Sequence, residues 1–158
     1  MTSHTAPTTE AASPAKDPHA RPRLRIHSTW LSLWALLTAF AAFEVIKHGF
    51  MNGSPLYALA LTGTSVGFFI APDLTLIIGI GDEVPEGSLS TKAVPFYNAM
   101  HRMLVALAFT SVIGIGLAPL APLPLALFIG GLSWMAHIAM DRAAGYGLRN
   151  SDGSRELQ

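Results

Sequence analysis

Residues 123–140 read LPLALFIGGLSWMAHIAM, and the only ionisable side chain in this stretch is His137. A helix that crosses a bilayer needs about 17–25 predominantly apolar residues, so this run is long enough to do so. Asp141 and Arg142 follow it directly. We therefore expect a transmembrane helix that carries a histidine into the membrane and ends at a charged pair.

Three earlier runs have the same character, and they extend from about Thr29 to Ile46, Leu56 to Ile80 and Ala93 to Leu117. Soluble core helices are rarely this long and this apolar in four successive copies. The linkers between the runs are short, which forces neighbouring helices to be antiparallel. The sequence therefore predicts an all-α, polytopic membrane protein whose domain, residues 28–148, is an antiparallel bundle of four transmembrane helices.

The composition supports a membrane protein and narrows its chemistry. Of the 158 residues, 51% are hydrophobic and 13% are charged, whereas charged residues make up about a quarter of a soluble domain. The apolar runs make the lipid bilayer the expected partner, and the formal net charge of zero provides no global field that would attract nucleic acid. The chain has no cysteine, which excludes disulfides and zinc–thiolate sites, so any metal ion would need nitrogen and oxygen ligands.

The two ends of the chain are polar. Residues 1–27 place several prolines among small polar residues, so we expect a disordered tail, and residues 149–158 form a second, short tail. Lysine and arginine are concentrated in these tails and in the middle loop, whereas the two opposite loops contain only Lys47. The positive-inside rule then predicts that both termini are cytoplasmic in a multi-pass protein of the cell inner (plasma) membrane.

Five polar residues fall inside the apolar runs or at their edges, namely Asp73, Asn98, His101, His137 and Asp141. An ionisable group at the centre of a membrane helix costs about 2.5–3.5 kcal/mol on insertion scales. Such groups usually face a partner or a cavity rather than lipid. These positions are therefore the first candidates for a functional site.

The expected depths of these residues agree. Asp73 lies eight residues before the predicted end of its helix and His101 eight residues after the start of its own, which places both about 12 Å from the same face. His137 lies about 8 Å from that face by the same rise per residue. Asn98 shares a helix face with His101, and Asp141 shares one with His137, because the spacings are i,i+3 and i,i+4. We expect the five side chains to meet in the cytoplasmic half of the bilayer.

Three interpretations of this cluster remain open at the level of sequence. Two imidazoles, two carboxylates and an amide could bind a divalent metal ion, or the histidines could pass a proton along an ion pathway. The cluster could also be purely structural, because Asp73 could cap the helical segment after Pro72 and His137 could simply bond Asp141. The HExxH and phosphate-loop motifs are missing from the sequence.

We hypothesise a metal-assisted hydrolase of a lipid or lipid-linked substrate, in which Arg102 or Arg142 contacts an anionic headgroup. The metal ligands or acid–base groups would come from Asp73, Asn98, His101, His137 and Asp141. A structural or accessory membrane protein and a small proton- or ion-coupled carrier are the alternatives. A carrier of four helices would need a homo-oligomer, which the small-residue face of Gly63 and Gly67 could support.

Three strings carry a resemblance to a known family, and they are Ala71-Pro72-Asp73-Leu74, Tyr97-Asn98-x-x-His101 and Trp134-x-x-His137-x-x-x-Asp141-Arg142-x-x-Gly145-Tyr146-Gly147-Leu148-Arg149. Together they resemble a small bacterial integral-membrane family, domain of unknown function 4260, from about Leu56 to Arg149. The resemblance implies a helical membrane domain and no particular activity. The Pro-Asp and His elements also resemble, as a pattern only, membrane-bound metal-dependent hydrolases.

Overall fold

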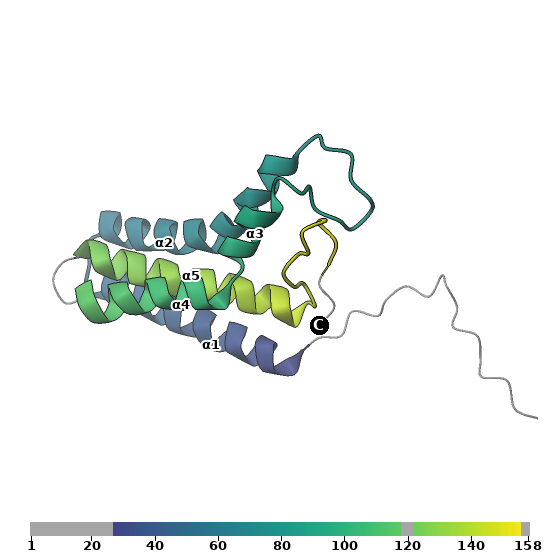
Figure 1. Cartoon of the computed structure of the whole chain (residues 1–158). Coiled ribbons are helices and arrows are strands. Elements are labelled where there is room, and N and C mark those ends of the chain that lie inside the picture. The colour runs from purple at the N-terminus through teal and green to yellow at the C-terminus, as the bar shows by residue number, and fades with distance from the viewer. Residues whose placement is uncertain (1–26, 118–121, 156–158) are drawn as a thin grey trace, which may run out of the picture.

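The computed structural model of the chain describes residues 27–117 and 122–155 (Figure 1). The tail predicted to be disordered therefore lies outside the described residues, except for His27. The backbone N–H of His27 donates to the carbonyl of Ala143 at 3.2 Å. This bond joins the start of the first helix to the end of the last one, so these two helices are antiparallel.

The first half of the chain forms two long helices. Helix α1, Ser28–Val45, continues as a π-helical turn over Ile46–Met51. Helix α2, Pro55–Ile70, begins at Ser54, whose hydroxyl accepts the N–H of Tyr57 at 3.2 Å, and this is the usual way to satisfy a free amide at a helix start. Helix α2 then tightens into a 3-10 helix over Ala71–Gly79. Pro72 explains part of this change, because it has no N–H for an α-helical bond.

The second half of the chain is less regular. Helix α3 covers Val94–Met100, and helix α4 covers Met103–Ser111 and continues as a π-helical turn over Val112–Leu117. Helix α5, Pro122–Ala143, is straight and long. Figure 1 shows α5 in the middle of the bundle, where it packs against α1, α2 and α4.

Three described helices are long and apolar enough to cross a membrane, and they are Ser28–Met51, Pro55–Gly79 and Leu123–Ala143. The first two carry large apolar side chains on their outer surfaces, such as Leu36 and Leu56, which are 68% and 76% exposed. Contiguous exposed apolar surface of this kind is typical of contact with lipid. The prediction of a helical, multi-pass membrane protein is thereby confirmed.

The third predicted span, Ala93 to Leu117, is not one continuous helix. His101 leaves the α-helical conformation and Arg102 is extended, with φ −86° and ψ 113°, so this run divides into α3 and a shorter apolar helix. The break is stabilised from α5, because the indole N–H of Trp134 donates to the carbonyl of Met100 at 2.7 Å. The described residues thus support three full-length membrane helices rather than the four we predicted.

The contact between α4 and α5 depends on a glycine. A Cβ atom at Gly131 would collide with the hydroxyl oxygen of Thr110 on α4, and that hydroxyl is held by its bond to the carbonyl of Ala106 at 2.7 Å. By contrast, a Cβ atom at Gly63 on α2 would meet no atom within 4 Å. The small-residue face of Gly63 and Gly67 is therefore open in the monomer, and the homo-oligomer stays a prediction.

We predict that Gly131→Ala destabilises the protein by about 1–3 kcal/mol, the usual cost of inserting a methyl group into a packed core. Thermal unfolding in detergent measures the effect. Gly63→Ala is the matched control and should not lower the unfolding temperature. Adding Thr110→Ala to Gly131→Ala should recover part of the loss. An unfolding temperature unchanged by Gly131→Ala would contradict the close approach of α4 and α5.

Candidate metal centre

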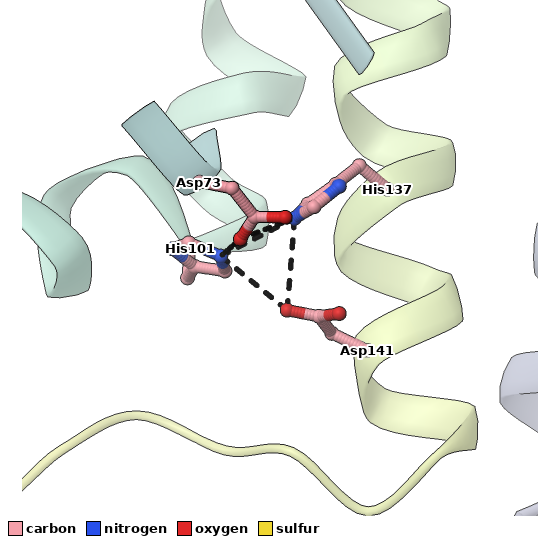
Figure 2. Close-up of side chains that lie close together, drawn as sticks. All are labelled: Asp73, His101, His137 and Asp141. Atoms are coloured by element: carbon pink, nitrogen blue, oxygen red, sulfur yellow. Dashed lines mark hydrogen bonds and ion pairs between the residues drawn. The ribbon is translucent and has the colours of Figure 1, made fainter. Parts of the chain in front are cut away.

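Four of the predicted site residues meet at the end of the bundle where α3 approaches α5 (Figure 2). Asp73 comes from the 3-10 helix after α2, and His101 comes from the break between α3 and α4. His137 and Asp141 lie one turn apart on α5. We call these four residues the His/Asp cluster. Segments far apart in the sequence therefore converge on one point.

The distances within the His/Asp cluster are short and similar. The Nε2 atoms of His101 and His137 lie 3.3 Å apart. Each also lies near one oxygen of Asp73, at 3.7 and 3.6 Å, and near one oxygen of Asp141, at 3.3 and 3.6 Å. All four ligand atoms lie within 4.8 Å of one another. Zinc bonds of about 2.0–2.1 Å in a regular tetrahedron give edges of roughly 3.3–3.4 Å, so the spacing suits a tetrahedral ion.

The surroundings of the His/Asp cluster favour a cation. The side chains of His101 and His137 are only 3% and 2% exposed, whereas those of Asp141 and Asp73 are 17% and 50% exposed. Among the described residues, neither carboxylate pairs with a lysine or an arginine. Two like charges this close repel each other unless a positive charge lies between them. The greater exposure of Asp73 leaves one side of the cluster accessible.

The backbone of α3 fixes the tautomer of His101. Its Nδ1 lies 2.8 Å from the carbonyl of Tyr97, and a carbonyl can only accept, so Nδ1 carries the hydrogen. Its Nε2 therefore presents a lone pair to the cluster, as a metal ligand must. The ring of Tyr97 also stacks on the imidazole, with the centroids 3.8 Å apart. The i,i+4 spacing places Tyr97 and His101 on one helix face, but spacing alone does not predict that their rings stack.

His137 is held by α2. The ring of Phe69 meets the imidazole edge to face, with the centroids 5.4 Å apart, and His137 also forms a hydrogen bond to the backbone of Phe69. On its other side the imidazole meets the ring of His101 at 5.3 Å. Both histidines are therefore oriented by contacts outside the His/Asp cluster.

The side-chain amide of Asn98 bonds the C-terminal segment of the chain. Its side-chain amide donates to the carbonyl of Arg149 and accepts the N–H of the same residue, both at 2.8 Å. These two bonds attach the C-terminal segment, residues 148–155, to α3. Since both polar atoms of the amide are used in this way, we do not assign Asn98 as a ligand.

The two arginines predicted to contact a headgroup lie at the edge of the site. Arg142 donates to the carbonyl of Tyr146 at 3.3 Å and to that of His101 at 3.4 Å. Arg102 is exposed and occupies the extended position just before α4. Arg142 therefore supports the helix break, whereas the guanidinium of Arg102 lies at the surface.

The C-terminal segment also fastens the loop between the 3-10 helix and α3. Arg149 donates to the carbonyl of Gly87 at 2.8 Å, and its guanidinium lies 5.7 Å from the ring centre of Tyr97. Gly153 adopts a positive φ of 86°, and a Cβ atom there would collide with the carbonyl oxygen of Leu89. Only glycine fits this turn without strain. The segment thus covers the face of Tyr97 and holds the loop beside it.

Within that loop, Asp82 is an anchoring point. Its carboxylate accepts the hydroxyl of Ser90 and pairs with the ammonium of Lys92 at 3.0 Å. The bond from Ser90 and the contact with Lys92 lower the pKa of the Asp82 carboxyl from its ordinary value of 3.8. The ionised form is therefore the one that stabilises the loop.

We predict that acid loosens this loop. Because the folded-state pKa of Asp82 is depressed, the stability that its ionised carboxylate gives the loop is complete above pH 3.8, the ordinary pKa. That stability is lost as the pH falls through the lower folded-state pKa. Hydrogen exchange across the loop, corrected for the intrinsic pH dependence, should report faster opening. Asp82→Asn should reproduce that opening at neutral pH, whereas Glu83→Gln should not. Equal exchange in Asp82→Asn and the wild type would contradict this anchoring role.

The chain matches a known protein family. The family described as Domain of unknown function (DUF4260) matches residues 55–157. The matched region contains the whole His/Asp cluster and leaves α1 outside. No curated protein and no solved structure matches the chain. The resemblance predicted from the sequence is confirmed by this match, and it brings no activity with it.

Proposed function

Because the chain belongs to the DUF4260 family, whose function is unknown, we propose its function from the His/Asp cluster alone. The cluster binds a divalent transition-metal ion of the zinc class inside the membrane domain. Two imidazole nitrogens and two carboxylate oxygens are donors that zinc accepts in a tetrahedral site. The two carboxylates together carry two negative charges, which balance the charge of such an ion.

One observation carries this proposal, namely that four potential ligand atoms from three separate segments lie within 4.8 Å of one another. Among the described residues neither carboxylate has a lysine or arginine partner, and a metal ion would pair all four atoms at once. The fixed tautomer of His101, set by the Tyr97 carbonyl, is a further feature of metal-binding histidines. Burial of both imidazoles is consistent with the same function.

We further propose that the centre hydrolyses a lipid or lipid-linked substrate at the cytoplasmic leaflet. For hydrolysis, His101, His137 and Asp141 would hold the ion, and Asp73 would leave the fourth position to a water molecule. The ion would lower the pKa of that water toward neutrality and so supply hydroxide. The hydroxide adds to the carbon or phosphorus of an ester, the bond to the leaving oxygen breaks, and that oxygen takes up a proton. Asp73 is half-exposed, so it is the cluster member best placed to exchange that proton. Arg102, exposed beside His101, would contact an anionic headgroup.

Metal analysis of the protein purified in detergent with a histidine-free tag tests the metal centre. We expect a single divalent ion per chain and a lower unfolding temperature after removal of that ion with a chelator, since an ion that binds only the folded state stabilises it. Release of fatty acid or phosphoester product from lipid in mixed micelles, with and without the ion, tests the hydrolase. Bound metal without product would leave a metal-binding accessory protein. The absence of metal would favour a structural polar core, in which the two imidazoles share a hydrogen bond.

A further inference from the structure

A groove of about 420 Å³ lies between α1, α2 and α5. This volume is within the range of about 300–1,000 Å³ that is common for small-molecule sites. Its wall includes Ala42 on α1, Val66, Phe69 and Ile70 on α2, and Ala136 on α5. The groove is separate from the His/Asp cluster but adjoins it.

The wall of the groove is suited to an alkyl chain. None of the lining residues is ionisable. Its two serines, Ser65 and Ser133, bond each other at 2.7 Å, and the hydroxyl of Ser133 also donates to the carbonyl of Ile129 at 3.1 Å. Because these two hydroxyls are already paired and Thr38 supplies the remaining hydroxyl of the wall, most of the surface that the groove offers its occupant is apolar.

The groove leads to the His/Asp cluster. Phe69 lines the groove and also touches the imidazole of His137, with the ring centroids 5.4 Å apart. Ala136 immediately precedes His137, and Ile70 lies three residues before Asp73. The end of a chain that reached Phe69 and Ile70 would therefore lie next to the proposed ligands.

The groove opens on the lipid-facing side of the bundle. Val66 and Ile70 are 52% and 49% exposed, and both lie on a helix long enough to cross the membrane. One turn of an α-helix, about 10–12 Å wide with a pitch of about 5.4 Å, fills on the order of 400–600 Å³. The groove thus holds at most one turn of a partner helix, whereas a flexible lipid chain can enter it sideways from the bilayer.

We infer that this groove binds one acyl chain of a membrane phospholipid. Where the proposed metal centre operates, the inference also defines its substrate class, which is a lipid whose acyl chain fills the groove while its polar end reaches Asp73 and His137. That second part rests on the proposed function, but lipid binding itself does not.

Photo-cross-linking in nanodiscs tests the inference, with a phospholipid that carries a photoactivatable group in one acyl chain. We expect saturable labelling of α1 and α2 peptides that contain groove residues. Ala42→Trp fills the groove from its exposed side and should abolish this labelling. Ala39→Trp changes an exposed alanine of the same helix outside the groove, and its labelling should match that of the wild type.

The outcomes separate the two proposals. Labelling that is unsaturable and equal in both tryptophan variants means ordinary boundary lipid and overturns the inference, whatever the metal content. Cross-links from α2 to a second copy of the chain, lost in Ala42→Trp, also overturn it. Saturable labelling in a protein that binds no metal overturns the metal centre and supports the groove. Ala42→Trp should keep its bound ion in any case, because its side chain lies outside the His/Asp cluster.

Discussion

Replacing His137 with alanine is expected to abolish tight metal binding. The imidazole is 2% exposed and contributes one of the four converging ligand atoms, and its burial against Phe69 and His101 leaves no room for another ligand to replace it. Loss of a partner that only orients a ligand lowers affinity about 10–100-fold. Loss of the ligand itself should therefore exceed about 100-fold, and metal analysis should find an empty site. Hydrolysis of lipid, measured in mixed micelles, should fall with it.

His48→Ala is the matched control for this variant. His48 lies on the π-helical turn after α1 and pairs with Glu44 at 3.3 Å, away from the His/Asp cluster. It should retain the ion at the wild-type level, which excludes non-specific binding to surface histidines. Unchanged metal content in both His137→Ala and His101→Ala would contradict the metal centre. Melting of the metal-free wild type and His137→Ala at the same temperature would show that the variant is folded.

Much of this molecule could be predicted from local sequence pattern. The length and apolar character of residues 123–140 were enough to identify α5, and the same reasoning identified α1 and α2. Depth along each helix then indicated that Asp73, His101 and His137 would lie near one another. The depth of a residue in the membrane can be predicted from local sequence, because it depends only on the number of residues to the helix end and on the rise per residue. The structure brings these side chains together, while their role as metal ligands stays a prediction.

The break at His101 could not be predicted in this way. Neither His101 nor Arg102 is a glycine or a proline, so no local signal ends the helix there. The partners that stabilise the break, Trp134 and Arg142, lie on α5 and reach the carbonyls of Met100 and His101. Contacts between residues this far apart in the sequence are invisible to helical periodicity. The same reason explains Asn98, which shares a helix face with His101 by spacing but bonds Arg149.

Replacing Tyr97 with alanine is expected to weaken metal binding by about 10–100-fold, the usual effect of removing a partner that orients a ligand. The tyrosine ring is 4% exposed and stacks on the imidazole of His101 at 3.8 Å. Without the ring, the imidazole can rotate away from the position in which Nε2 faces the cluster. Competition with a chelator of known affinity measures the change. The absorption spectrum of the cobalt-loaded protein reports whether the remaining site is still tetrahedral.

Tyr97→Phe distinguishes this positioning role from general packing. Phenylalanine keeps the stacked ring and loses only the hydroxyl, so it should restore the affinity and the cobalt spectrum of the wild type. Phe96→Ala, at an exposed neighbouring position, should change neither. A loss of affinity in Tyr97→Phe equal to that in Tyr97→Ala would mean that the hydroxyl, rather than the stacked ring, matters. An unaltered affinity in Tyr97→Ala would show that the bond from Nδ1 to the Tyr97 carbonyl, which the variant retains, is sufficient to orient His101.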